Sequence, residues 1–141
     1  MLKVRRLGGA PFTVVPCDNL VDNGEVTRRL VGSLVAALDR PGDKFAVWLS
    51  TSVSFPSTMV DRIAPATTEE DREIAAGLLG LREDARVVAE PFKQWVIEDD
   101  FAGPRPDWEK AFAILTRDVA PYERIKLRVL NGSHSMFAYL G

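Results

Sequence analysis

Apolar residues recur at helical spacing in three stretches of the chain. In the first, Asp22 and Glu25 have the spacing of a capping box. Apolar residues then recur at every fourth position, at Val26, Leu30, Leu34 and Leu38, and two more, Val31 and Val35, lie beside them. This pattern predicts a helix that is closed by Pro41 and Gly42.

The second stretch begins with Thr67 and Glu70, again at capping-box spacing, and ends at Gly80. Its apolar side consists of Ile74, Ala75, Leu78 and Leu79. The third stretch predicts a last helix from about Pro121 to Leu140.

Short β-rich runs lie between the helical stretches. Strands are predicted at 12–15, at 86–90 and at 94–97, the last two separated by Pro91. The run 45–49 is too short to assign, and 53–60 predicts irregular structure or an edge strand because of Pro56. A short helix is expected over 107–116, with Trp108, Phe112 and Leu115 facing inward. This order of elements predicts an α/β protein with at least one crossover connection.

Composition narrows the class of protein. The 141 residues, 46% of them hydrophobic, suit one domain with a buried core. The net charge of -2 argues against nucleic acid or an anionic membrane as a partner. Cys17 and His134 are the single cysteine and histidine, so a tetrahedral Cys/His zinc cage is excluded. No apolar run approaches the roughly 20 residues that span a bilayer, and we predict a soluble, cytoplasmic protein.

The last helix carries a polar cluster at the border of its apolar face. On a wheel of about 100° per residue, with Lys126 at zero, Glu123 lies near 60°, His134 near 80° and Asn131 near 140°. Lys126 itself falls inside the apolar margin. Apolar surroundings disfavour a charged lysine, which would let Lys126 act as a general base.

The same cluster suits proton transfer at a secondary alcohol. The Asn131 amide can donate to a developing oxyanion, and the His134 imidazole can orient a hydroxyl or the lysine amine. The alternative is purely structural. In that case Lys126 extends past the apolar surface into water, Asn131 caps or kinks the helix with Gly132, and His134 is a satisfied, partly buried side chain.

Four motifs in sequence order resemble one enzyme family. They are Lys126-x4-Asn131-x2-His134 (K-x-x-x-x-N-x-x-H), Cys17-Asp18-Asn19 followed by Asn23-Gly24, the segment 55–63 (FPSTMVDRI), and the segment 90–99 (EPFKQWVIED). Together they resemble the polyol-specific long-chain dehydrogenases, which include mannitol 2-dehydrogenases and the fructuronate (mannonate) and tagaturonate oxidoreductases. Ser57 departs from the asparagine usual in that family.

The resemblance implies a metal-independent hydride transfer between NAD(H) and C2 of a polyol, or of the matching 2-keto sugar. It implies that Lys126 is the general acid/base, that Asn19 and Asn131 hold the reacting oxygen, and that His134 positions substrate and lysine. Glu123 matches a glutamate associated with passage of the proton to solvent.

The resemblance also implies a domain organisation. Residues 1–117 would be the C-terminal part of a Rossmann-type dinucleotide-binding domain, and 118–141 the first helix of an all-helical C-terminal domain. No G-x-G-x-x-G turn occurs in the sequence, so we expect a central fragment that is inactive by itself. The alternative is a non-catalytic module that self-associates through the apolar stripe Ile125, Val129, Met136 and Leu140 of its last helix.

Cofactor neighbours follow from the resemblance as well. Asn19, Met59, Val60 and Asp61 are expected near the nicotinamide end of NAD. A local ion pair between Asp61 and Arg62 is the structural alternative for that segment. Cys17 is expected to be a small filler rather than a reactive thiolate.

Overall fold

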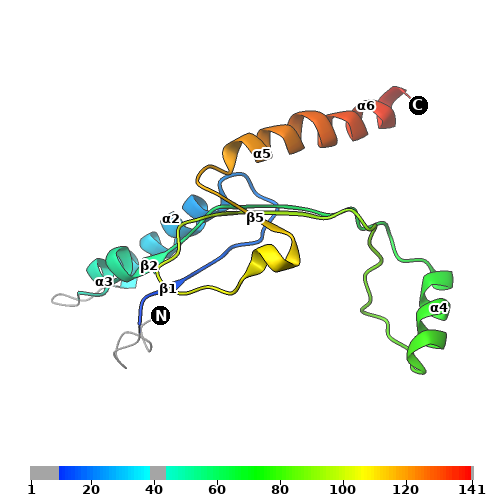
Figure 1. The fold of residues 1–141 in the computed structure, drawn as a ribbon, viewed down its shortest axis with the longest axis horizontal. Coiled ribbons are helices and arrows are strands. Elements are labelled where there is room, and N and C mark those ends of the chain that lie inside the picture. The colour runs from blue at the N-terminus through cyan, green and yellow to red at the C-terminus, as the bar shows by residue number, and fades with distance from the viewer. Residues whose placement is uncertain (1–9, 39–43, 141) are drawn as a thin grey trace.

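Two short parallel strands and two helices form the first half of the fold. The structure, a computed structural model, describes residues 10–38 and 44–140, so the predicted helix stop at Pro41 and Gly42 lies outside the described residues (Figure 1). Strand β1 (Phe12–Thr13) pairs in parallel with β2 (Val53–Ser54). The connection between them runs through α2 (Asn23–Leu38) and α3 (Phe45–Ser52), which confirms the predicted crossover.

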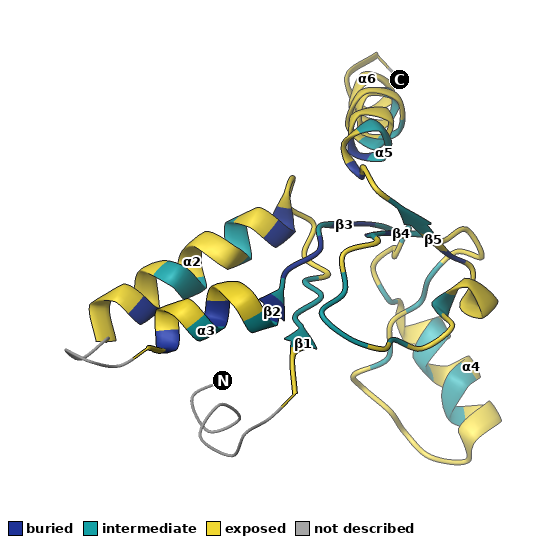
Figure 2. Ribbon diagram, turned by 60° about the vertical axis from the view of Figure 1, so that its left-hand side comes forward, coloured by how far each residue is buried: buried dark blue, intermediate teal, exposed yellow. Residues whose placement is uncertain are grey.

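One side of α2 packs into the core, and it is not the side with the regular leucines. The core cluster of this half contains Val35, Phe45, Leu49, Val53 and Phe55, with Val31 packed against it. Leu30, Leu34 and Leu38 are 66%, 59% and 65% exposed. Much of the α2 ribbon is accordingly coloured as exposed (Figure 2). The predicted helix is confirmed, and the valines carry its packing.

The run that could not be assigned from sequence is the helix α3. Phe45 and Leu49 are one turn apart and both buried, and Trp48 stacks on Phe45 with ring centroids 5.6 Å apart. A single turn of apolar contacts is too little periodicity to distinguish a helix from a strand in sequence.

A second sheet has the order β3-β4-β5, with β3 (Thr58–Asp61), β4 (Gln94–Glu98) and β5 (Ala113–Thr116). Strand β3 is antiparallel to β4, and β5 is parallel to it. Val96 and Ile97 on the central strand are fully buried. The stretch 53–60 thus contains β2 and the start of β3, separated at Phe55–Ser57, and β3 lies at an edge of its sheet as expected.

Two predicted elements are wrong. Residues 86–90 form no strand, because only the amide of Glu90 reaches a backbone partner, the Ile63 carbonyl. The helix expected over 107–116 is a short 3₁₀ helix, η1 (Trp108–Ala111), followed by β5. Phe112 between them has φ of 69° and is 74% exposed, so it does not face inward. Trp108 does pack inward, with its ring 5.6 Å from that of Trp95.

Helix α4 (Glu69–Leu79) extends away from both sheets on two long connecting segments (Figure 1). Its capping box is formed by Thr68 and Asp71, one residue later than predicted. The stop at Gly80 is confirmed, because that glycine has φ of 70°. The side chains of Ile74, Leu78 and Leu79 are exposed.

The last helical stretch begins at Ala120, one residue before the prediction, and runs to Leu140. It consists of α5 (Ala120–Ile125), a π-helical segment η2 (Lys126–Asn131) and α6 (Gly132–Leu140). Near its start, Tyr122 packs on the cluster of Met59, Val96 and Val119. The rest of the helix projects beyond the sheet (Figure 1). Among the described residues, no helix combines the length and the hydropathy needed to cross a membrane.

Candidate active site

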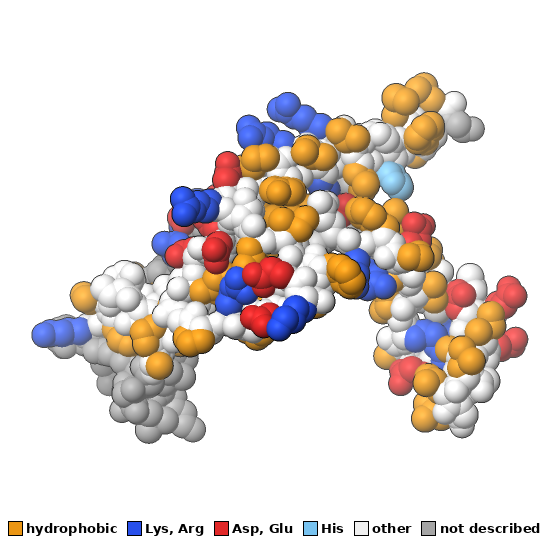
Figure 3. All heavy atoms as spheres, in the orientation of Figure 1, with side chains coloured by type: hydrophobic (Ala, Val, Ile, Leu, Met, Phe, Trp, Pro, Cys, Tyr) orange, Lys and Arg blue, Asp and Glu red, His pale blue; other side chains and the backbone are white. Residues whose placement is uncertain are grey.

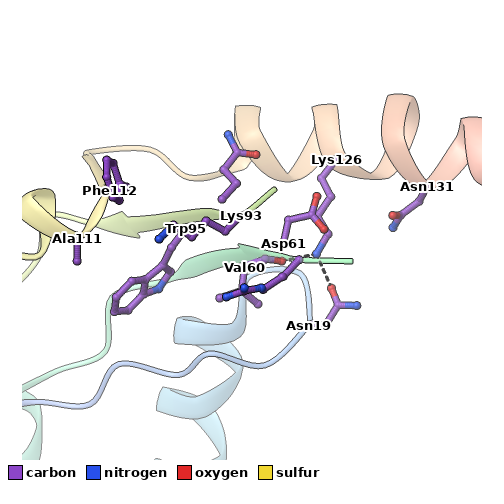
Figure 4. Close-up of a pocket in the computed structure, with 11 residues that line it drawn as sticks. Asn19, Val60, Asp61, Lys93, Trp95, Ala111, Phe112, Lys126 and Asn131 are labelled. Carbon is purple, nitrogen blue, oxygen red and sulfur yellow. Dashed lines mark hydrogen bonds between the residues drawn. The ribbon is translucent and has the colours of Figure 1, made fainter. Parts of the chain in front are cut away.

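A cavity of about 460 Å³ lies between the last helix, strands β3 and β4, and the loop before α2 (Figure 4). Its lining combines charged, amide and aromatic side chains. The lining residues are Asn19, Val60, Asp61, Arg62, Lys93, Gln94, Trp95, Ala111, Phe112, Lys126 and Asn131. The volume falls within the range of small-molecule sites, and the mixed lining suits a polar ligand.

The amine of Lys126 is fixed between two oxygen atoms at this cavity. Its Nζ donates to Asn19 Oδ1 over 2.8 Å and to the Val60 carbonyl oxygen over 2.5 Å. The side chain is half-buried. The sequence placed this lysine among apolar groups, but its nearest partners are polar. It does not extend freely into water, as the structural alternative required.

The π-helical segment brings Asn131 to the same side as Lys126. In an α-helix, residues five apart are separated by about 140°, as the helical wheel assumed. In this segment the amide of Gly132 donates to the carbonyl of Leu127, which is the i to i+5 pattern of a π-helix. The wider turn places residues five apart closer together on one face. Lys126 and Asn131 both line the cavity and both extend toward the sheet (Figure 4).

Glu123 lies three residues before Lys126 on the last helix and is buried, with 8% of its surface exposed. Its Oε1 accepts the backbone N–H of Asp22 over 2.9 Å. It borders a cavity of about 50 Å³ that Lys126 and Asn19 also line. It also borders a second cavity, of about 320 Å³, which Glu98 and Arg117 line. Glu123 therefore lies between the lysine and another opening of the molecule.

A sequence profile described as the mannitol dehydrogenase Rossmann domain matches residues 1–110. This chain belongs to the mannitol dehydrogenase family. The uncharacterized oxidoreductase YdfI of Escherichia coli is 54% identical over 97% of the chain and 28% of its own length. D-mannonate oxidoreductase of E. coli is 48% identical over 99% of the chain and 28% of its own length.

A solved structure gives the same assignment. Mannitol 2-dehydrogenase of Pseudomonas fluorescens, in a ternary complex with NAD and D-mannitol, matches with a TM-score of 0.79 and 44% identity. The match covers 94% of this chain and 26% of that one. The predicted α/β, Rossmann-type fold is thereby confirmed. The chain spans 28% of the length of both curated relatives named above.

Two residues expected at the site of this mannitol dehydrogenase family member lie outside the main cavity. His134 is exposed on α6 and does not line it, so the partly buried histidine that the structural alternative required is not found either. The π-helical segment lies between Lys126 and His134 and changes the rotation that the wheel assumed. Met59 is 3% exposed, and its side chain belongs to the core with Val96 and Val119, although it lies on the same strand β3 as Val60 and Asp61.

Several lining residues of this family member were not singled out by the sequence pattern. Trp95 lines the cavity, and its buried indole N–H has no hydrogen-bond partner in the structure. Lys93 lies over the ring of Phe112, with 4.7 Å from its Nζ to the ring centroid. The pairing of Asp61 with Gln94 across β3 and β4 brings this segment to the site. The sequence predicted a strand at 94–97 and a family motif at 90–99, but no site residue in this segment.

The remaining sequence expectations concern single residues. Among the described residues, no ion pair joins Asp61 to Arg62, and both line the cavity. Cys17 is exposed, so the expectation of a small filler is wrong. Partial desolvation raises the pKa of its thiol, and the nearby charge of Asp18 raises it further, so a reactive thiolate is disfavoured as expected. In the described part of the chain, no group of three or more His, Cys, Asp or Glu side chains is placed to hold a metal ion.

Proposed function

We propose that this chain supplies the proton-transfer part of an NAD-dependent oxidoreductase. The reaction interconverts a polyol or aldonate, such as mannitol or mannonate, and its 2-keto sugar, fructose or fructuronate. One observation carries the proposal: Lys126 Nζ is held by Asn19 Oδ1 and the Val60 carbonyl at the wall of a cavity that Asn131 also lines. The names of the relatives support the substrate class.

Lys126 is proposed as the general acid/base. An unprotonated amine has two N–H bonds and one lone pair. The two oxygen acceptors engage both N–H bonds, which leaves the lone pair free to take the proton of a substrate hydroxyl. In the reverse direction the protonated amine returns that proton to the oxygen of the 2-keto group. An amine thus does the work that a metal ion does in other alcohol dehydrogenases.

The two asparagines are proposed to hold the substrate oxygen. Asn19 uses its Oδ1 on Lys126, so its Nδ2 remains a donor beside the same cavity. Asn131 lines the cavity from the last helix. Amide donors fixed at a developing oxyanion stabilise the transition state more than the ground state. We keep His134 as a proposed residue for positioning substrate and lysine, on the family motif alone.

Glu123 is proposed to pass the proton between Lys126 and solvent. It shares the cavity of about 50 Å³ with Lys126, and it borders the outer cavity on its other side. A carboxylate between two such spaces can relay a proton through water. The family motif assigns the same role to this position.

The cavity fits the reactive end of NAD. Its volume suits a nicotinamide with its ribose, and the unpartnered indole N–H of Trp95 offers a donor. Asn19, Val60 and Asp61 would hold this end of NAD, and Met59 would support them from the core. When bound, NAD supplies the two-electron acceptor for oxidation of the alcohol.

We also propose a boundary between two domains at residues 117 and 118. The segment 1–117 would complete a dinucleotide-binding domain, and 118–141 would begin a helical one. Asp118 Oδ1 accepts the amide of Ala120 over 3.0 Å, at the start of the last helix. The chain alone is proposed to be inactive, because a cofactor that is not held in place cannot be positioned for reaction.

The test replaces the matching stretch of E. coli D-mannonate oxidoreductase by this chain and follows NADH oxidation with fructuronate, tagaturonate and fructose. We expect turnover by this chimera, a loss of roughly 10²-fold or more with Lys126→Met, and little change with Lys110→Met. Lys110 is an exposed lysine paired with Asp107, which makes it a matched control. Full turnover by the Lys126→Met chimera contradicts the proposed role, and turnover by the chain alone contradicts its proposed inactivity.

A second candidate function is self-association through the last helix. Its exposed apolar residues gather along one projecting element (Figure 3). They include Ile125, Val129, Met136, Phe137 and Leu140, which are 62%, 61%, 54%, 70% and 78% exposed. A patch of this kind favours contact with another chain. Light scattering over a range of concentrations tests this function, and a strict monomer throughout contradicts it.

A further inference from the structure

We propose that Asn23 is a positioning residue that holds both oxygen acceptors of Lys126 in place. The proposal rests on the function proposed for Lys126. Asn23 is the first residue of α2 and does not line the main cavity. Its side chain acts instead on the two segments that carry Asn19 and Val60.

The amide group of Asn23 is buried and has a partner for each of its polar atoms. The residue is 1% exposed. Its Oδ1 accepts the backbone N–H of Thr58 over 2.8 Å. Its Nδ2 donates to the Asp18 carbonyl and to Thr58 Oγ1, both over 3.0 Å, and lies 3.5 Å from the Pro16 carbonyl. A buried polar network satisfied in this way allows the segments one arrangement.

These contacts lie next to the two acceptors of the lysine. Asp18 directly precedes Asn19, whose Oδ1 binds Lys126 Nζ. Thr58 begins β3 and lies two residues before Val60, whose carbonyl binds the same nitrogen. One side chain therefore joins the loop and the strand that together hold the lysine. Thr58 Oγ1 strengthens the link by donating to the Pro16 carbonyl over 2.5 Å.

The backbone of α2 is close enough for the short asparagine side chain to reach both segments because Gly24 follows it. A Cβ on Gly24 would lie 2.4 Å from the Phe55 carbonyl oxygen and 2.6 Å from the Ser57 nitrogen. The first turn of α2 thus rests directly on the chain that leads into β3.

The test observes the Lys126 amine itself, so it does not depend on turnover. The chain is labelled at lysine with ¹³C and ¹⁵N, and the Lys126 Cε and Nζ signals are assigned by their absence in Lys126→Arg. Asn19→Ala gives the chemical-shift change of the Lys126 signals that follows when one of the two acceptors is removed. We expect Asn23→Ala to shift the Lys126 signals in the same direction by more than half that change, and the Lys110 signals to stay unchanged.

Thr13→Val is the matched control. The Thr13 hydroxyl also belongs to a part-buried network, with Ser54 Oγ at 2.9 Å and the Ala102 amide at 3.0 Å, but neither partner contacts Lys126. We expect this variant to lose a comparable amount of thermal stability and to leave the Lys126 signals in place. General loosening of the fold would move them in both variants, which would overturn the proposal.

A milder variant keeps the proposal testable if Asn23→Ala fails to fold in a circular dichroism melt. Thr58→Val removes one partner of the Asn23 amide and keeps the backbone N–H. We expect a smaller shift of the Lys126 signals in the same direction. Unshifted signals in whichever variant folds overturn the proposal, and so do unshifted signals in Asn19→Ala. If these shifts occur while the chimera keeps full turnover with Lys126→Met, the proposed function fails and the positioning by Asn23 stands.

Discussion

The Glu123 carboxylate accepts the backbone N–H of Asp22 over 2.9 Å, across 101 positions of sequence. Asp22 has φ of 54°, a left-handed conformation that non-glycine residues adopt rarely. Its own Oδ1 accepts the hydroxyl of Ser57 over 3.1 Å. The turn that leads into α2 is therefore held from the last helix and from the segment before β3. Glu123 thus connects the elements that carry Lys126 and Asn19, whatever it does for the proton.

Glu123→Ala is expected to destabilise the fold by about 1–3 kcal/mol, because it removes the charged acceptor that the Asp22 N–H has on a buried side chain. Glu123→Gln keeps a carbonyl oxygen at the same place and should restore most of that loss. The free energy of unfolding in urea measures both changes. The proton-relay role makes the opposite prediction for turnover in the chimera. Because a glutamine side chain cannot carry a proton, Glu123→Gln should not restore turnover there. Rescue of turnover by Gln would leave Glu123 with a structural role only.

Gly24→Ala and Gly32→Ala are expected to have opposite effects, although both lie in α2. A Cβ at position 24 meets backbone atoms at 2.4 and 2.6 Å, so the helix or the segment before β3 must shift, at a cost of about 1–3 kcal/mol. A Cβ at position 32 meets nothing within 4 Å, and alanine there should stabilise the helix by about 0.4–1 kcal/mol. Thermal melts of the two variants decide the matter. Equal changes in melting temperature would show that α2 does not closely approach the segment before β3.

Thr68→Ala is expected to loosen α4 because it removes the capping box. Amide exchange in 72–79 should become about fivefold faster, the usual size of a lost N-cap. Thr67→Ala is the control, since Thr67 Oγ1 makes one long contact, 3.4 Å from the Arg86 carbonyl. If Thr67→Ala speeds amide exchange more than Thr68→Ala does, the capping box lies at Thr67 and Glu70, as the sequence predicted.

The same capping box makes α4 sensitive to acid. Hydrogen bonds from the side chain and the backbone of Thr68 lower the pKa of Asp71 below its ordinary value of 3.8. A carboxyl whose pKa falls on folding stabilises the folded form at pH values above the unfolded pKa, and this contribution is lost as the pH falls through the folded pKa. Amide protection in α4 should therefore be constant above about pH 5 and decrease below pH 3.8. In Thr68→Ala this acid dependence should shrink, because the main cause of the lowered pKa is gone.

The long helices could be predicted from sequence because their apolar periodicity continues over several turns. The helix at Asn23–Leu38 and the last helix from Ala120 were found to within a residue at their starts. Short elements such as α3 and β5 depend on partners far away in sequence, and so the pattern left α3 unassigned and read β5 as helix.

The site could be predicted only in part. The polar cluster on the last helix placed Lys126, Asn131 and Glu123 near one another, but the assumed 100° per residue ignored the π-helical segment and misplaced His134. The contact of Lys126 with Asn19 spans 107 positions, and no local spacing encodes it. Asn19 entered the candidate site through the family motif alone. Asn23 was visible in the same motif, but its role depends on burial and on the Thr58 contacts, which only the fold provides.

The helix predicted over 107–116 is wrong at Phe112, and a substitution there distinguishes an inward-facing Phe112 from an exposed one. An inward Phe112 would make Phe112→Gly cost about 3–5 kcal/mol, as for other buried aromatic residues. In the structure the residue is 74% exposed, and its φ of 69° suits glycine. Glycine relieves a left-handed strain of about 1–2 kcal/mol. It also loses the contact of Lys93 with the ring, worth about 0.5–1 kcal/mol at an exposed site, and adds freedom to the unfolded chain.

These terms nearly cancel, so we expect Phe112→Gly to unfold within about 1 kcal/mol of the wild type in urea. Ile97→Ala is the control for a core position on the adjacent strand β4. Ile97 is fully buried, and its loss should cost about 2–5 kcal/mol. Phe112 also lines the main cavity, so the glycine variant opens that wall without unfolding the sheet. If Phe112→Gly lowers the free energy of unfolding as much as Ile97→Ala does, the Phe112 ring lies in the core, and 107–116 forms the helix that the sequence predicted.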